Sequence, residues 1–194
     1  MILQRRNIFI ALGAVIILEI IWAGFTLFKP ATINVATQSS VVPTVKQQLS
    51  EISLQTPKNQ IKVGEKFTVS INISSSKKSD GADLIIKYDP QLLSVETTGL
   101  NKIPVIVGTI YSDYPSNNLD EKVGRITVSG ITEQRNGVST NGLFGSLVFR
   151  SKAKGRSKVT LDFTPGSTVD SNIIESGTGK DVLEKVNNLE VNIE

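Results

Sequence analysis

The sequence of 194 residues contains no cysteine and no histidine. The chain therefore cannot form a disulfide scaffold, use a thiolate nucleophile or build a cysteine–histidine zinc site. A Ser-His-Asp triad is excluded for the same reason. A glycosidase needs two carboxylates that face one cleft, and no motif singles out such a pair among the acidic residues. We therefore expect a protein that is not an enzyme and that requires no cofactor or metal.

An excess of positive charge on the folded part is also missing. Residues 1–50 carry four basic residues and one acidic residue, whereas residues 51–194 carry 17 of each, so the net charge of +3 belongs to the N-terminal segment. A nucleic-acid-binding domain is expected to concentrate positive charge on its folded surface. This distribution argues against nucleic acid as a partner.

A long apolar run is present near the N-terminus. From Ile8 to Phe28 the sequence contains a single charged residue, Glu19. As a helix this run would span about 30 Å, the thickness of the hydrocarbon core of a bilayer. Signal peptides have a shorter apolar stretch, of roughly 7–15 residues, followed by small residues at a cleavage site. Because a Lys-Pro pair follows here, we predict an uncleaved transmembrane helix.

The flanks of this run predict its orientation. Arg5 and Arg6 precede it, and positive flanks stay in the cytoplasm. Residues 1–7 would then be a cytoplasmic stub, and the rest of the chain would lie outside the cell membrane. Glu19 is either a tolerated protonated side chain or a contact with the membrane helix of another subunit.

The remaining sequence divides into a spacer and a β-rich domain. Residues 29–50 are rich in Thr, Ser, Gln and Val, have little charge and show no periodicity, which is typical of a linker. From residue 51 onward, apolar and polar residues alternate with the period of strands, most clearly at 67–73. Only residues 181–186 suggest a short helical turn. The other predicted strands are 52–55, 82–88, 93–97, 103–111, 125–131, 142–150, 158–163 and 189–193.

The fold class follows from this pattern. About nine short strands separated by Gly, Pro and Asn turn signals are typical of an all-β, two-sheet antiparallel jelly roll or β-sandwich. We predict such a domain over residues 51–194, preceded by one transmembrane helix. A core of this size is stable without disulfides.

Three stretches carry a resemblance to a known family. They are VGEKFTV at residues 63–69, GADLIIKYDP at 81–90, and GRITVS at 124–129 followed by NGLFGSLVF at 141–149. In this order they resemble the cohesin domains, which share a jelly-roll fold with family 3 carbohydrate-binding modules. Taken alone, each stretch is explained by strand and turn formation, with Asp89 and Pro90 ending one strand.

The resemblance implies a docking function. Cohesins receive dockerin modules on a flat sheet face that includes strands similar to 82–88 and 125–131. The chain lacks the calcium loop of a dockerin, so it would be the receptor and not the ligand. The residues expected to contact a protein partner are Asp83, Ile85, Lys87, Arg125, Thr127 and Ser129.

Glycan binding is the alternative function that the same fold suggests. Sugar rings stack on exposed flat aromatic side chains. Residues 51–194 contain no tryptophan. Tyr111 and Tyr114, in the predicted loop 111–122, either pack that loop or offer their rings to a polysaccharide, and we favour packing. A third alternative is a structural subunit of an envelope complex, assembled through Glu19.

Two charged clusters are also notable. Asp113, Asn117, Asn118, Asp120 and Glu121 supply oxygen ligands of the kind that Ca²⁺ takes, but their spacing matches no known calcium loop. We interpret them as a solvated acidic loop. The second cluster places basic residues at every second position and is interpreted as a solvated face or a surface that attracts an acidic partner. It consists of Arg150, Lys152, Lys154, Arg156 and Lys158.

Overall fold

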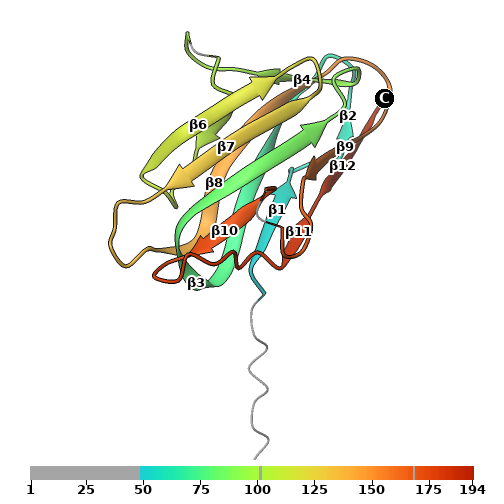
Figure 1. Ribbon diagram of the computed structural model, residues 1–194. Helices are drawn as coiled ribbons and strands as arrows, with labels where there is room; N and C mark the ends of the chain where they lie inside the picture. The colour runs from blue at the N-terminus through green and yellow to red at the C-terminus, as the bar shows by residue number, and fades with distance from the viewer. Residues whose placement is uncertain (1–48, 101, 168) are drawn as a thin grey trace, which may run out of the picture. The chain divides into compact units, whose positions relative to one another are not determined.

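A computed structural model describes residues 49–100, 102–167 and 169–194, which form twelve β-strands (Figure 1). This part of the chain contains no helix, and hence none with the length and apolar character needed to cross a membrane. The predicted membrane helix from Ile8 to Phe28, the stub before it and residues 29–48 of the spacer lie outside the described residues. The all-β prediction for the domain is confirmed.

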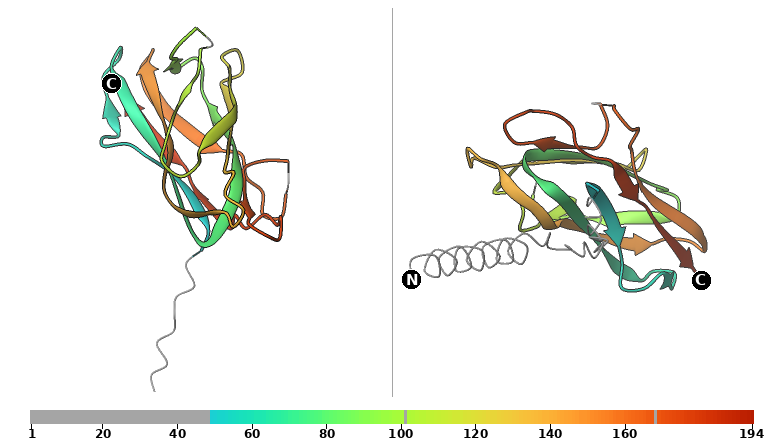
Figure 2. Two further views of the ribbon diagram at one scale, coloured as in Figure 1. Left: turned by 90° about the vertical axis from the view of Figure 1, so that its left-hand side faces the viewer. Right: turned by 90° about the horizontal axis from the view of Figure 1, so that it is seen from below.

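The strands form two layers, which Figure 2 shows edge-on. The long strand β3 (Lys66–Tyr88) runs through both layers, so the hydrogen-bonded ladder is continuous from one to the other. The first layer contains β11 (Lys185–Asn187), β1 (Glu51–Gln55), the first half of β3, β8 (Val138–Ser151), β4 (Leu93–Glu96) and β5 (Val105–Val107). The second contains β6 (Asp113–Asp120), β7 (Arg125–Ile131), the second half of β3, β10 (Asn172–Glu175), β9 (Gly155–Leu161), β12 (Leu189–Ile193) and β2 (Gln60–Ile61).

The core lies between the layers and is built from inward-facing residues of both. Phe149 of β8 is fully buried and stacks on Phe67 of β3, with ring centroids 5.7 Å apart. Tyr88, at the other end of β3, meets the edge of the same Phe149 ring at 5.3 Å. The single strand β3 thus supplies aromatic side chains to both sides of one aromatic cluster, which holds the layers together.

Several predicted elements differ from the structure. The segments 67–73 and 82–88 belong to one strand, because the chain between them bends between the layers at a register shift near Ser74 and Lys78. Of the predicted strand 103–111, only β5 forms. The pairs β1–β11 and β2–β12 are parallel, so the sandwich is not wholly antiparallel.

The helical turn predicted at 181–186 is wrong. Asp181 instead accepts hydrogen bonds from the backbone N–H groups of Ile173 (3.0 Å) and Leu183 (2.9 Å). Side chains that bond to the backbone in this way compete with helix formation. The segment therefore runs as irregular chain into strand β11.

Candidate binding face on the second layer

One outer face of the sandwich is formed by β6, β7 and the second half of β3, which lie side by side in Figure 1. In β7, Ile126 and Val128 are fully buried, while Arg125 is exposed and Thr127 and Ser129 are partly exposed. This alternation follows from the two-residue period of a strand that has one face on the core. The polar residues of β7 therefore all point to the same outer surface.

The strand register brings the six predicted partner-binding residues together. Across the β3–β7 ladder, Asp83 lies opposite Ser129, Ile85 opposite Thr127, and Lys87 opposite Arg125. Neighbouring strands are about 4.8 Å apart, so opposite side chains are direct neighbours. Residues about 40 positions apart in the sequence thus lie next to each other on the sheet.

Strand β6 extends this patch, and sequence reasoning missed it by treating 111–122 as a loop. Its residues Ser116, Asn118 and Asp120 pair with outward positions of β7. The only sequence signal for a strand here is Leu119 between two polar residues, which is too short a pattern to detect. We call the whole surface the β7 face, which consists of Asp83, Lys87, Asp113, Ser116, Asn118, Asp120, Arg125, Thr127, Ser129 and Ile131.

Ile85 does not belong to this exposed surface. Its side chain is only 7% exposed although its neighbours Leu84 and Ile86 point to the core. The segment between β9 and β10 lies against this position: Ile85 donates its backbone N–H to Ser171 Oγ at 3.0 Å, and Asp162 donates its own N–H to the Ile85 carbonyl at 2.8 Å. The prediction that Ile85 contacts a partner is therefore wrong, because its side chain is already buried within the domain.

The charges of the β7 face are only partly neutralised. Lys87 forms an ion pair with Asp162 at 2.7 Å. Asp83 and Arg125 are exposed and form no ion pair with any described residue. The carboxylate of Asp120 lies opposite Arg125 in register, but it accepts the backbone N–H of Lys122 at 3.0 Å and so caps the β6–β7 turn.

The two tyrosines proposed for glycan stacking lie against the core. Tyr111 is 5% exposed, and its hydroxyl is 2.6 Å from Ser79 Oγ. Tyr114 is half-buried and donates its hydroxyl to the Phe144 carbonyl, and both rings meet the edge of the Phe144 ring. Burial raises the pKa of Tyr111 to about 12 and also raises that of Tyr114. The alternative in which both rings are open to a sugar is therefore wrong, because Tyr111 is buried and Tyr114 is tied to the β8 backbone.

Two polar residues of the acidic cluster around β6 bond to the backbone of the domain. Asn117 points between the layers, where its amide accepts the N–H of Val105 at 3.1 Å and donates to the Val105 carbonyl at 2.8 Å. Asp113 accepts the N–H of Tyr114 at 2.8 Å. No group of three potential metal ligands occurs within the residues that the structure describes.

The basic residues from Arg150 to Lys158 do not form one stripe. Arg150 bonds to Glu96 of β4 on the first layer. Arg156 and Lys158 share Glu190 on the second layer, at 3.1 and 3.7 Å. Lys152 donates to the Pro90 carbonyl at 2.6 Å, and Lys154 lies exposed in the turn between β8 and β9. The basic residues before and after the β8–β9 turn therefore lie on different layers.

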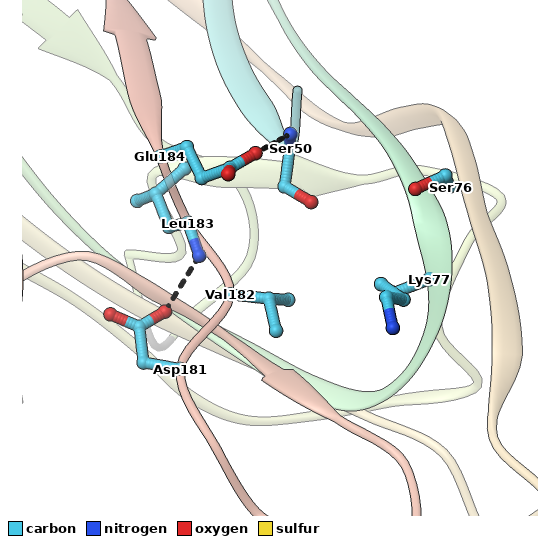
Figure 3. Close-up of a pocket in the computed structure, with 7 residues that line it drawn as sticks. All are labelled: Ser50, Ser76, Lys77, Asp181, Val182, Leu183 and Glu184. Carbon is cyan, nitrogen blue, oxygen red and sulfur yellow. Dashed lines mark hydrogen bonds between the residues drawn. The ribbon is translucent and has the colours of Figure 1, made fainter. Parts of the chain in front are cut away.

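A small pocket lies beside the start of β1, and Figure 3 shows its lining. Its volume is about 250 Å³. Glu184 accepts the N–H of Ser50 at 2.8 Å, and Asp181 accepts that of Leu183. The ammonium group of Lys77 is paired with Glu175 at 2.9 Å. The charged groups that line this pocket all bond within the chain. They hold the start of β1 in place and leave no reactive group for a ligand.

Comparison with known proteins identifies a family. A family model described as the cohesin domain matches residues 50–193. No curated protein matches the sequence. These residues also resemble solved structures, and at the 20–22% identity of the three described next the likeness shows the fold alone.

Three of these structures illustrate the range. A type II cohesin domain from the cellulosome of Acetivibrio cellulolyticus gives a TM-score of 0.62 at 21% identity, covering 74% of this chain and 95% of that one. The sixth cohesin from scaffoldin B of the same organism, in complex with a Cel5 dockerin mutant, gives 0.58 at 22% identity, covering 75% and 99%. A non-cellulosomal cohesin from the hyperthermophilic archaeon Archaeoglobus fulgidus gives 0.56 at 20% identity, covering 75% and 91%. The predicted sandwich fold is confirmed.

Proposed function

The chain belongs to the cohesin family, and on that premise we propose that it is a membrane-anchored receptor that binds a dockerin-type protein through the β7 face. Cohesin domains are non-catalytic protein-interaction modules, which agrees with the prediction that the chain is not an enzyme. Some solved cohesins of similar fold are bound to a dockerin, as is the scaffoldin B cohesin in its complex with a Cel5 dockerin.

The observation that carries this proposal is the exposed β7 face. Its strands are fixed by hydrogen bonds to neighbouring strands and by a fully buried row of side chains beneath, such as Leu84, Ile126 and Val128. A surface that is rigid before binding loses little conformational entropy in the complex. Thr127 and Ser129 at its centre are small and uncharged, so that a partner can approach the sheet closely.

The experiment captures a partner and locates its binding surface. The full chain in mild detergent is immobilised and exposed to the secreted proteins of the native organism, and retained proteins are identified by mass spectrometry. We compare the wild type with Thr127→Arg, which places a long charged side chain at the centre of the face. The matched control is Thr68→Arg, at an exposed position of β3 in the first layer.

We expect the wild type and Thr68→Arg to retain dockerin-bearing proteins, and Thr127→Arg to lose them. Titration calorimetry with the captured dockerin module should show at least a hundredfold weaker binding to Thr127→Arg. Two outcomes would contradict the proposal. One is that no dockerin-bearing protein is retained by the wild type, and the other is that Thr127→Arg binds as tightly as the control.

The location at the cell membrane is the second part of the proposal. It is supported by the apolar run from Ile8 to Phe28, which is long enough to cross a bilayer, and by the positive charge of Arg5 and Arg6 before it. The spacer 29–50 would let the domain reach partners beyond the membrane surface. Protease treatment of intact cells should degrade residues 51–194, and carbonate washing should leave the chain in the membrane fraction. Release by carbonate would refute the anchor.

A further inference from the structure

The two ends of the β7 face carry opposite, unpaired charges. Asp83 and Asp113 lie near the end of the face where β7 finishes, and Arg125 lies where β7 begins. All three are exposed, and none forms an ion pair with another described residue. Glu96 on the first layer, by contrast, forms ion pairs with both Arg150 and Lys66.

The separation of these charges suits a single extended contact. Asp83 lies opposite Ser129 and Asp113 opposite Ile131, four and six residues along β7 from Arg125. At about 3.3 Å per residue, the opposite charges are roughly 13–20 Å apart. That span corresponds to about nine to thirteen residues of an α-helix, at about 1.5 Å per residue.

No charged side chain among the described residues forms an ion pair with Arg125. Lys87 is paired with Asp162. Asp120 lies opposite Arg125 in register and keeps its charge, while one of its oxygens accepts the backbone N–H of Lys122. Arg125 is therefore the cation that is left for a partner at this end.

An apolar side chain lies between the two carboxylates. Ile131 is 39% exposed at the end of β7 and is flanked in register by Asp113 and Gly81. Gly81 has no side chain to cover it: a β-carbon there would lie 3.3 Å from Ile131 Cγ2. A lysine or arginine can lay its aliphatic stem on such a residue while its charge meets a carboxylate. The combination of an exposed isoleucine and two unpaired acids fits these side chains better than an apolar or acidic one.

We propose that the partner docks along β7 in one orientation, with a lysine or arginine at the Asp83–Asp113–Ile131 end and an aspartate or glutamate at the Arg125 end. This inference rests on the proposed function and adds the chemistry of the partner's contact residues. Reversing the partner on the face would place like charges together at both ends. Such juxtapositions are strongly unfavourable, and complementary charges therefore fix orientation more than they add affinity.

The test uses the full chain and the recombinant dockerin module obtained in the capture experiment. The variants are the double substitution Asp83→Lys with Asp113→Lys, and the single substitution Arg125→Glu. Glu194→Lys is the control, because it makes the same kind of charge change beyond β12, separated from β7 by other strands. Circular dichroism and thermal melting confirm that each variant is folded.

We expect each face variant to bind at least tenfold more weakly than the wild type, and the control to bind within twofold of it. The affinity of the wild type should fall as salt is added, and the fall should be smaller for both face variants. A dockerin module in which the facing basic residue, located by cross-linking to the Asp83 end, is changed to glutamate should recover binding to the double variant.

The outcomes separate the two proposals. If both face variants bind like the wild type while Thr127→Arg does not, the docking face is correct and the charge-oriented contact is rejected. If the charge-reversed dockerin fails to recover binding, the assignment of a basic residue to the Asp83 end is rejected. If the wild type captures no dockerin-bearing protein, the proposed function fails and this inference fails with it.

Discussion

On the first layer, charged side chains of the outer face bond to each other. Glu96 of β4 accepts from Arg150 Nε at 2.8 Å and from Lys66 Nζ at 3.0 Å, and at the other end Lys185 lies 3.7 Å from Glu51. We call this surface, formed by β1, β4, β8 and residues 66–74 of β3, the β8 face. On the β7 face, by contrast, Asp83 and Arg125 are left without a described ionic partner.

This difference separates charges that serve the fold from charges that are available to a partner. An exposed ion pair contributes little to stability, but it removes both charges from recognition of other molecules. A face with unpaired charges, small central residues and a rigid sheet can instead select a complementary surface. The following experiments test whether the two faces really divide in this way.

The largest effect is expected beneath the β7 face, at Gly130. A β-carbon at this position would lie 2.7 Å from Tyr111 Cδ2 and 2.9 Å from Phe144 Cε2, so that larger side chains cannot fit. Gly130→Val should lower the free energy of unfolding by roughly 3 kcal/mol, measured by urea titration. Ser129→Val, which adds the same side chain on the outer side of β7, should change it by less than about 0.5 kcal/mol. Equal losses in the two variants would show that β7 does not tolerate valine on either side. Close packing beneath the strand would then not explain the loss at Gly130.

A smaller loss is expected where Asn117 ties β6 to β5. Asn117→Ala removes two hydrogen bonds to Val105 and should cost about 2 kcal/mol. Asn118→Ala is the matched control, because this neighbour points outward and bonds only to Ser116 Oγ at 3.0 Å. The same urea titration should show almost no change for the control. If the two variants were equally stable, the hydrogen bonds between Asn117 and Val105 would contribute nothing to the stability of the strands that form the β7 face.

Alkaline pH should affect the side of the core that supports the β7 face. Burial raises the pKa of Tyr111 to about 12, above the ordinary value near 10, so the neutral phenol stabilises the fold below pH 10 and this stability is lost as pH rises toward 12. The loss from Tyr111 should be about 1 kcal/mol by pH 11. Tyr111→Phe should reduce the pH dependence between pH 9 and 11 by that amount. An unchanged dependence would assign the alkaline loss to other groups, such as Tyr88, whose pKa burial also raises to about 12.

The smallest effect on stability is expected on the β8 face itself. The Arg150 guanidinium, and then Lys66, hold the pKa of Glu96 below its usual value. Its contribution is therefore present above the pKa of an unfolded glutamate and is lost as pH falls through the lowered value. Glu96→Gln should cause a slight loss of thermal stability at pH 7 that disappears in acid, and no change in dockerin binding. Asp83→Asn should show the opposite pattern, with unchanged stability and weaker binding.

The sequence predicted the exposed positions of the β7 face better than it predicted the neighbouring elements. Alternation in 82–88 and 125–131 is regular because each strand has one side on the core, and it placed Asp83, Lys87, Arg125, Thr127 and Ser129 on the outside. The same rule failed for Ile85, whose side chain is buried and whose backbone bonds to Asp162 and Ser171, more than 70 residues away. Local periodicity carries no information about such distant neighbours.

Strand β6 and the two tyrosines were misjudged for a related reason. The segment around Asp113, Pro115 and Asn117 has the composition of a loop, and it becomes a strand because β7 offers a ladder for it. Pairing with β7 then turns Tyr111 and Tyr114 toward Phe144. Tyr111 is buried and Tyr114 half-buried in this arrangement, and the glycan platform that they suggested is lost.

The sequence by itself determined that residues 51–194 form an all-β domain and that the chain has no thiol or imidazole group, because composition and the two-residue period are local properties of the chain. Its motifs also pointed to the cohesin family. Only the tertiary structure decided which charges find a partner and which remain on the surface, and which aromatic rings are buried. Those outcomes depend on the register between strands that are distant in sequence, and no local pattern records that register.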